Sequence, residues 1–385
     1  MIEVGHVQKL VETSYKNSDA IVLLKDLTGV MNELPAQTRE ILIQSGVHYS
    51  EMLPKEDEPS CEYMELYTKA LESKALDIAK GIAKISEMTM LEKGYIKSGK
   101  RTDTPIFVSL ARAGIPVGVL MKRYIKDRYN IDCEHYAISI IRDKGIDENA
   151  MEFIYSNLKD KTVKNIVFVD GWTGKGMIKM QLDEAVKSLK EKDKKWEELS
   201  SELYVLADPA NITEFCGTRK DFLLPSACLN STVSGLISRT ILNSYTDVKA
   251  GDFHGAVYFE KFEGIDKTNE FIDKICREFP YIGNVDRSRM SLDTSDFNGM
   301  DTTLNICKQF DIPDFKKVKP GIGETTRVLL RRVPWRVLIN TNVPDTDKDI
   351  EHILMLCRYK HIPIERVPMG NYKVCGVIKE LSADA

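Results

Sequence analysis

A glycine-rich segment in the middle of the chain has the residue types of a phosphate-binding turn. Residues 166–169 form a short β-branched apolar run, which is typical of a buried strand. The turn that follows contains Asp170, Gly171, Thr173, Gly174, Lys175 and Gly176. Residues 177–189 then carry apolar side chains at helical spacing. Because glycines let backbone N–H groups approach an anion and a helix N-terminus adds positive partial charge, this segment is a candidate phosphate cradle. The alternative interpretation is an ordinary strand-to-helix turn.

Two other predicted strands also end on cations. The apolar residues 105–110 lead into Arg112, and residues 136–141 lead into Arg142 and Lys144. The carboxyl ends of parallel strands meet at one edge of a sheet, which is where such sheets bind ligands. We therefore expect these cations to gather beside Asp170. Several cations with one carboxylate suit a polyphosphate held together with a metal ion.

Cysteine chemistry is the other possibility. The chain has eight cysteines and no C-x-x-C pair, which predicts reduced thiols and no structural zinc site. Cys228 lies among small polar residues that suit a tight turn or a helix start, and a helix N-terminus would lower the pKa of its thiol. Its candidate base is His254, with Asp252 or Asn230 to orient the ring and His48 or His135 as weaker choices. The alternative is that Cys228 is a small buried apolar residue.

The elements that must position these residues alternate along the chain. Residues 63–97 predict one long amphipathic helix or two. Strands predicted at 105–110, 136–141, 166–169 and 203–207 alternate with helices, which indicates an α/β fold with a doubly wound parallel sheet. We expect four parts: a helical and loop-rich extension over 1–100, an α/β core over 101–275, a polar linker over 276–316, and a small α/β domain over 317–385.

The composition is that of an ordinary globular protein. The 385 residues carry a formal charge of −4, and 43% of them are hydrophobic. No run of 18 apolar residues predicts a membrane span, and the first residues lack the layout of a signal peptide, so we expect a cytoplasmic protein with no membrane partner. The near-neutral charge balance means that any nucleic-acid site must be local.

The core motifs resemble those of type I phosphoribosyltransferases. V-F-V-D-G-W-T-G-K-G at 167–176 is similar to their phosphoribosyl-diphosphate loop, V-S-L-A-R-A-G at 108–114 to their pyrophosphate loop, and S-I-I-R-D-K-G at 139–145 falls where they have a flexible catalytic loop. The resemblance implies a ligand of phosphoribosyl diphosphate or a nucleotide, with Mg²⁺ bridging the diphosphate and no dedicated metal site on the protein. Gly171 stands where that family usually has a second acidic residue.

The same resemblance implies roles for individual residues. Asp170 would bind the ribose hydroxyls, and the turn at 173–176, which is Thr173, Gly174, Lys175 and Gly176, would wrap the 5′-phosphate. Pyrophosphate would be held by Arg112, Ala113 and Gly114, and the residues that close over it would be Arg142 or Lys144. Arg142, Lys144 and Asp170 are therefore the catalytic residues expected on this interpretation.

A narrower resemblance covers residues 1 to about 300. HYSEMLP at 48–54, SLARAG at 109–114, SIIRDKGID at 139–147, VDGWTGKG at 169–176, LPSACLNSTVSGLISRT at 224–240 and DFHGA at 252–256 resemble a bacterial family. That family is described as phosphoribosyltransferase-like, is also named cysteine protease StiP, and is associated with tellurite-resistance and stress-response operons. Its second name implies a cysteine peptidase, for which Cys228 is the candidate nucleophile and His254 the candidate base.

The C-terminal residues resemble the Pelota RNA-binding domain, through G-I-G-E-T-T-R at 321–327, W-R-V-L-I-N at 335–340 and L-C-R-Y-K-H-I-P-I at 356–364. That resemblance places Gly321, Gly323, Glu324 and Arg327 at an RNA-contacting turn. A local basic cluster could meet phosphates there, and it comprises Lys319, Arg327, Arg331, Arg332 and Arg336.

We therefore predict an enzyme with a type I phosphoribosyltransferase-like sheet that binds phosphoribosyl diphosphate or a nucleotide with Mg²⁺, joined to a domain that binds structured RNA, in a stress or tellurite-resistance pathway. The first alternative is a cysteine protease of the StiP type. The second is a non-catalytic sensor that binds nucleotide in the core and RNA at the tail.

Overall fold

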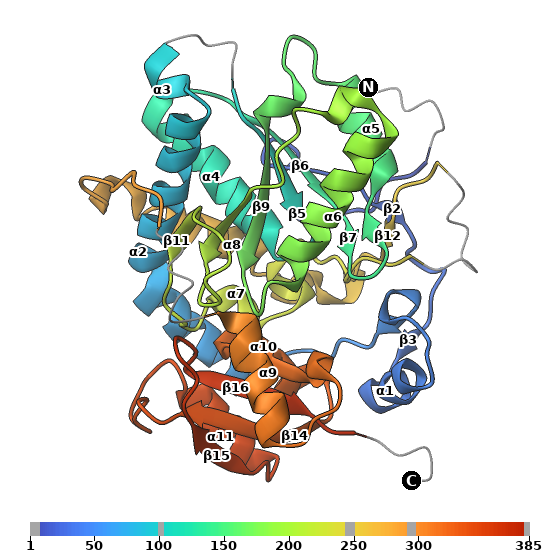
Figure 1. The fold of residues 1–385 in the computed structure, drawn as a ribbon, viewed down its shortest axis with the longest axis vertical. Helices are drawn as coiled ribbons and strands as arrows, with labels where there is room; N and C mark the ends of the chain where they lie inside the picture. Colours follow the sequence, from blue (N-terminus) through green and yellow to red (C-terminus); the bar gives the residue numbers. More distant parts are fainter. Residues whose placement is uncertain (1–7, 99–103, 243–250, 291–297, 381–385) are drawn as a thin grey trace.

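A six-stranded parallel sheet forms the centre of the molecule in the computed structural model, which describes residues 8–98, 104–242, 251–290 and 298–380. All of its strand pairs are parallel. In spatial order the strands are β1 (Ile21–Val22), β6 (Glu134–Ile138), β5 (Ile106–Leu110), β9 (Ile166–Trp172), β10 (Leu203–Ala207) and β11 (Cys216–Thr218). The predicted α/β fold with a parallel sheet is confirmed (Figure 1).

Helices cover both faces of this sheet, because every inner strand is apolar on both sides. Phe107 and Val169 point to the face packed by α2 (Cys61–Glu92), α4 (Gly114–Tyr129) and α8 (Thr268–Cys276). Their neighbours Val108 and Phe168 point to the opposite face, where α5 (Glu148–Ser156) and α6 (Met177–Lys192) pack. The alternation follows from the two-residue period of a strand.

The predicted N-terminal extension is part of the core. β1 is an edge strand of the central sheet, and α2 packs against α4, β10 and β11. Residues 63–97, for which one or two helices were predicted, form the single long helix α2 and the short α3 (Tyr95–Ser98). Ser60 caps α2 by accepting a hydrogen bond from the Tyr63 N–H.

Short elements complete the core. Two-stranded pairings join β2 (Lys25–Asp26) to β12 (Gly255–Ala256), β3 (Glu33–Leu34) to β4 (Leu53–Pro54), and β7 (Ile140–Ile141) to β8 (Gly145–Ile146). The remaining short helices of the core are α1 (Ala36–Gln44) and α7 (Pro225–Cys228). Within the described residues, no helix is both long and apolar enough to cross a membrane.

A smaller mixed sheet forms the C-terminal domain. Its strands are β13 (Val318–Pro320), β16 (Val374–Ile378), β14 (Pro334–Asn340) and β15 (Ile364–Val367), and its helices are α10 (Ile322–Arg331) and α11 (Glu351–Tyr359). The stretch predicted to be a linker contains helix α9 (Gly299–Gln309), which contacts β13. Its buried side, Thr303, Ile306 and Cys307, packs toward that domain. Residues 291–297 of the predicted linker lie outside the described residues.

The two domains share apolar packing. One continuous hydrophobic cluster runs from α2 and the sheet through Leu224, Ala227 and Cys228 to Leu329 and Ile353 of the C-terminal domain. Helix α10 contacts α7, so the C-terminal domain lies against the end of the core that carries α7 (Figure 1).

Candidate functional site

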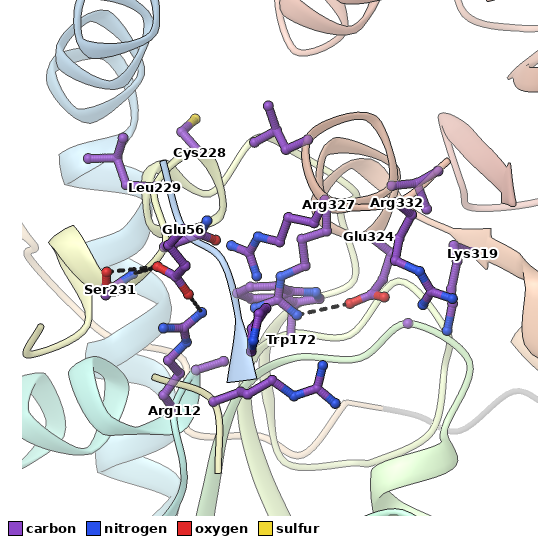
Figure 2. Close-up of a pocket in the computed structure, with 18 of the residues that line it drawn as sticks. Glu56, Arg112, Trp172, Cys228, Leu229, Ser231, Lys319, Glu324, Arg327 and Arg332 are labelled. Carbon is purple, nitrogen blue, oxygen red and sulfur yellow. Dashed lines mark hydrogen bonds and ion pairs between the residues drawn. The ribbon is translucent and has the colours of Figure 1, made fainter. Parts of the chain in front are cut away.

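A large cavity lies between the core and the C-terminal domain. Its volume is about 1080 Å³, which is ample for a drug-sized ligand. Three parts of the chain line it: the N-terminal segments around Arg39 and Glu56, the core loops at the carboxyl ends of β5 and β9, and helix α10 with its flanks. Figure 2 shows the Arg112–Glu56 pair and the Glu324–Arg327 pair on either side of Trp172.

The lining of this cavity is strongly cationic. Twelve lysines and arginines line it against five aspartates and glutamates. The cations are Arg39, Lys55, Arg112, Arg142, Lys175, Lys179, Arg239, Lys319, Arg327, Arg331, Arg332 and Lys360. Since the whole chain carries a formal charge of −4, this positive charge is concentrated locally. A hollow with such walls attracts anions.

Arg112, predicted to hold pyrophosphate, lies in the cavity wall and is paired. Its guanidinium donates to Glu56 Oε1 at 2.9 Å and to the Ile237 carbonyl at 2.6 Å. Glu56 also accepts hydrogen bonds from the Ser231 N–H and hydroxyl, at 3.0 and 2.7 Å. Burial alone would raise the pKa of Glu56, but Arg112, Arg331 and the Ser231 bonds hold it below its ordinary value. Glu56 is therefore ionised and neutralises one guanidinium.

Ala113 and Gly114, the other predicted pyrophosphate ligands, differ in position. Ala113 lines the cavity, whereas Gly114 packs under β9. A Cβ on Gly114 would lie 2.3 Å from the Val169 carbonyl oxygen, so the glycine is required there for close approach of α4 to the strand.

Asp170 lies at the cavity and is almost fully buried, with 8% of its surface exposed. Its Oδ1 accepts a hydrogen bond of 2.7 Å from the Gly171 N–H. Burial raises the pKa of Asp170 to about 7, and that hydrogen bond and Arg327 offset only part of the effect. The carboxyl group is thus partly protonated at neutral pH.

The predicted phosphate turn is already hydrogen bonded within the chain. The Thr173 hydroxyl donates to Asp208, and the Lys175 ammonium donates to the carbonyls of Phe315 and Val318, at 2.5 and 2.9 Å. The Gly174 carbonyl accepts from the Tyr372 hydroxyl at 2.6 Å. Burial lowers the pKa of Lys175 to about 7. The side chains expected to wrap a phosphate therefore hold the C-terminal domain and the end of β10.

Gly176, the last residue of that turn, has a φ of +87° and precedes α6. It lines the cavity beside the start of the helix, and its left-handed backbone explains the glycine.

The two cations of the predicted catalytic loop lie in different places. Arg142 lines the cavity, and its guanidinium lies 5.3 Å from the centre of the Tyr49 ring. The backbone N–H of Arg142 donates a hydrogen bond of 2.9 Å to the Tyr49 hydroxyl. Lys144 is exposed and is not part of the lining. Arg142 therefore joins Arg112 and Asp170 at the cavity, as predicted for neighbouring strand ends, and Lys144 does not.

The predicted RNA-contacting turn faces the core. The Arg327 guanidinium lies 4.4 Å from the centre of the Trp172 ring and donates to Glu324 at 3.1 Å. A Cβ on Gly323 would lie 3.1 Å from the Trp172 indole, so this glycine permits the contact. Gly321 precedes α10 with a φ of +92°. Lys319, Glu324 and Arg327 line the cavity, which brings the predicted RNA residues and the predicted phosphate residues together.

Cys228 lines the same cavity but has no histidine beside it. It is buried at the last position of the short α7, so the predicted helix N-terminus is wrong, and burial raises the pKa of its thiol to about 12. His254 lies elsewhere, with its Nδ1 at 2.8 Å from the Ser139 hydroxyl and its N–H bonded to Asp147. No described histidine lines the cavity, and no hydrogen bond joins Cys228 to His254 among the described residues.

The other candidate histidines are also placed outside the cavity. His135 is buried between Ser109 and the Asp19 carbonyl, and burial lowers its pKa to about 4. His48 contacts Ser50. The predicted arrangement of Cys228 with a histidine is therefore not assembled in this structure.

Four residues of the cavity were missed from the sequence: Arg39, Glu56, Trp172 and Arg239. Trp172 lies inside the V-D-G-W-T-G-K-G motif and Arg239 inside the motif at 224–240, but neither was given a role, whereas Arg39 and Glu56 come from segments without a motif that points to a site. Only the packing of α1 and its flanks against the core brings Arg39 and Glu56 to the same wall, so no local signal could have found them.

No protein site for a metal ion is built here. In the described ranges, no group of three or more histidine, cysteine, aspartate or glutamate residues could hold a metal ion. Asp170, which is partly neutral and followed by glycine, is a poor ligand by itself. The residues present do not fit a dedicated Mg²⁺ site, which leaves the predicted metal dependent on a ligand that would carry it.

The fold and the cavity define an α/β core with an appended RNA-binding-type domain, and comparison with known families gives the class. A family model described as "Tellurite-like stress resistance cysteine protease StiP" matches residues 13–276, and a model described as "PELOTA RNA binding domain" matches residues 297–380. Because the first match covers more than half of the chain, the chain belongs to the StiP cysteine protease family. The resemblances to the StiP family and to the Pelota RNA-binding domain are confirmed at the level of the family, and the resemblance to type I phosphoribosyltransferases stays a prediction.

One named relative extends this assignment over nearly the whole chain. "Cysteine protease StiP" of Acinetobacter baylyi (strain ATCC 33305 / BD413 / ADP1) is 30% identical over 382 residues, covering 96% of this chain and 94% of the relative. No solved structure matches the chain.

Proposed function

We propose that this protein is a cysteine peptidase of the StiP type, with the cavity as its substrate site and Cys228 as its nucleophile. Membership of the family supports the reaction, and one observation supports the residue: of the eight cysteines, Cys228 is the one among the residues that line the cavity. The thiolate attacks the peptide carbonyl, the C–N bond breaks as the amine leaves with a proton, and water hydrolyses the acyl-enzyme. The cationic wall favours a peptide that carries acidic side chains.

The thiol must first lose its proton. The pKa of Cys228 stands at about 12 because the group is buried, so the structure describes a resting form in which the nucleophile is protonated. Tyr63, a neighbour whose charge would interact with that of Cys228, has a buried hydroxyl without a hydrogen-bond partner among the described residues. Substrate entry would have to bring a base or a cation to this pair before attack.

This proposal predicts that Cys228→Ser removes peptide cleavage. The measurement is hydrolysis of a fluorogenic library of acidic peptides by the full chain, with Cys61→Ser as the matched control because Cys61 is exposed at the start of α2 and lies outside the cavity. We expect cleavage to fall to the background rate in Cys228→Ser and to be unchanged in Cys61→Ser. Undiminished cleavage by Cys228→Ser would exclude this nucleophile.

A second candidate is binding of phosphoribosyl diphosphate or a nucleotide with Mg²⁺. The observation that favours it is the meeting of Arg112, Arg142 and Asp170 at the carboxyl ends of neighbouring strands. A bound diphosphate would bring the Mg²⁺, whose charge would favour the ionised form of Asp170.

On this second candidate, calorimetry with phosphoribosyl diphosphate shows heat of binding that requires Mg²⁺. Asp170→Asn weakens binding by roughly tenfold or more, because a charged hydrogen-bond acceptor is lost. Asp160→Asn, an exposed aspartate outside the cavity, is the control and binds as the native protein does. Absence of Mg²⁺-dependent heat in the native protein would rule the candidate out.

The C-terminal domain adds a proposal about RNA. Its family match supports RNA binding, yet Gly323 and Arg327 pack on Trp172. While the domains are docked in this way, an RNA that used this turn would have to enter the cavity by a single-stranded end. A folded RNA would require the C-terminal domain to leave the core.

A further inference from the structure

Five arginines from three parts of the chain line the cavity, and we call them the arginine seam. They are Arg39 on α1, Arg112 after β5, Arg239 in the core, and Arg331 and Arg332 at the end of α10. Their charges act on one another: Arg39, Arg112 and Arg332 each lower the pKa of Arg239, and Arg112 lowers that of Arg331. The guanidinium groups therefore interact electrostatically across one cavity.

Carboxylates neutralise only two members of the arginine seam. Arg332 donates to both oxygens of buried Glu40 at 2.7 and 2.9 Å, and Arg112 pairs with Glu56 at 2.9 Å. Arg239 has no carboxylate partner: it donates to the Tyr49 carbonyl at 2.8 Å and lies 4.4 Å from the centre of that ring.

The other two arginines, Arg39 and Arg331, have no side-chain partner among the described residues. Arg39 is only 5% exposed, and neither Arg39 nor Arg331 makes a side-chain hydrogen bond or ion pair with any described residue. The Nε atoms of both are buried without an acceptor. An unpaired buried charge is costly, and burial lowers the pKa of both guanidinium groups accordingly. Groups that destabilise the ligand-free fold in this way are typical of binding sites.

The chemistry of the missing partner follows from these groups. Guanidinium forks bind phosphate and carboxylate oxygens in pairs. Three guanidinium groups that line one cavity without a hydrogen-bonded carboxylate among the described residues match a ligand that carries several closely spaced negative charges. An oligophosphate chain places its charges on adjacent atoms, whereas acidic side chains on a peptide are spread along a backbone.

We propose that the arginine seam binds the oligophosphate chain of a small ligand, such as a nucleoside triphosphate, held jointly by the N-terminal segment, the core and the C-terminal domain. The cavity of about 1080 Å³ has room for such a ligand. The site does not depend on Cys228 chemistry, and it shares only Arg112 with the residues expected to hold phosphoribosyl diphosphate. Because α1 and α10 both contribute, the ligand would fix the C-terminal domain on the core.

The test measures binding and stability in the same full-length variants. Sodium tripolyphosphate and ATP are titrated by calorimetry into the native protein, Arg39→Met and Arg331→Met, and the melting temperature of each is recorded without ligand. We expect both variants to bind roughly tenfold or more weakly than the native protein. Without ligand they melt at the same or a higher temperature, because an unpaired buried charge is gone.

The controls separate binding from structure. Arg358→Gln removes an exposed arginine of the same domain that does not line the cavity, and it binds both probes as the native protein does. Arg331→Lys keeps the charge without the fork, and it binds between the native protein and Arg331→Met even if the methionine variant folds poorly. A large fall in the ligand-free melting temperature of both Arg331 variants, with unchanged affinity, would assign the residue a structural role and overturn the proposal.

Two further titrations test whether the ligand is an oligophosphate rather than an acidic peptide or an RNA. A hexaglutamate peptide and a 5′-triphosphorylated RNA oligonucleotide are titrated alongside the two phosphate probes. Binding of either one while tripolyphosphate and ATP show none at millimolar concentration would overturn the proposal. If the arginine seam is the site, Asp170→Asn retains tripolyphosphate binding. The test of the arginine seam can therefore succeed or fail independently of the phosphoribosyl diphosphate candidate.

Discussion

Asp170 and Lys175 lie in one turn, and burial moves the pKa of both toward neutrality. The pKa of Asp170 rises to about 7 and that of Lys175 falls to about 7. Asp170 and Lys175, which the sequence suggested as charged ligands of a phosphate site, therefore carry reduced charge at neutral pH. Arg239 in the cavity differs because the ordinary pKa of an arginine is far above neutrality, so at a pKa of about 9 its side chain remains mostly charged.

This reasoning predicts how Asp170 affects stability as pH changes. The pKa of Asp170 is raised on folding from 3.8 to about 7, so the folded state holds its proton more tightly and stability falls as pH rises through that window. Asp170→Asn keeps an acceptor for the Gly171 N–H and removes the titration. We expect the variant to be more stable than the native protein at pH 8 by on the order of 1–4 kcal/mol, and to show no such gain below pH 4.

Urea unfolding at a series of pH values from 4 to 8 measures the difference. Asp160→Asn, whose side chain is exposed, is the control and follows the native curve. Parallel curves for Asp170→Asn and the native protein would show that Asp170 is ionised throughout.

At the scale of elements, the start of α10 is held by the core. The carboxylate of Asp221 accepts hydrogen bonds from the Ile322 N–H at 2.9 Å and the Lys373 N–H at 2.8 Å. A helix N-terminus leaves N–H groups without partners, and here a distant aspartate supplies one. That contact holds the first residue of α10, Ile322, against the core.

Asp221→Ala should therefore weaken the packing of the C-terminal domain on the core and lower the stability of the protein. Two buried N–H groups lose their acceptor, which we expect to destabilise the protein by about 2–4 kcal/mol. Asp221→Asn, which keeps one acceptor oxygen, should fall between. Thermal melting and limited proteolysis between the domains measure the effect, with Asp345→Ala, an exposed aspartate of the same domain, as the control. Equal melting of Asp221→Ala and Asp345→Ala would contradict this role.

At the scale of the whole molecule, the site exists only because three parts of the chain meet. The N-terminal segments, the core and the C-terminal domain each supply cations to one cavity, and Figure 2 shows Arg112 of the core with Arg327 and Arg332 of the C-terminal domain. Apolar packing between α7 and α10 holds the arrangement, and the turn predicted to contact RNA faces inward. Access to the cavity and access to that turn are consequently linked to the position of the C-terminal domain.

The sequence allowed much of the fold to be predicted. The predicted strand at 203–207 coincides with β10, and those at 105–110 and 166–169 begin within one residue of β5 and β9. Buried parallel strands are continuous apolar runs, so their signal is local. By contrast, strand β11 was not predicted. It is a short, partly polar segment, Cys216–Thr218, which becomes a strand only through pairing with β10.

The sequence by itself determined the family, the parallel sheet and the meeting of Arg112, Arg142 and Asp170, since each depends on local pattern and on the direction of strands. Only the tertiary structure decided which side chains are available to bind a ligand or to react. It committed Lys175 and Thr173 to partners within the chain, separated Cys228 from His254, and left the buried Nε atoms of Arg39 and Arg331 without a hydrogen-bond acceptor among the described residues. The physical reason is that burial and pairing depend on segments far apart in the chain, which no local pattern records.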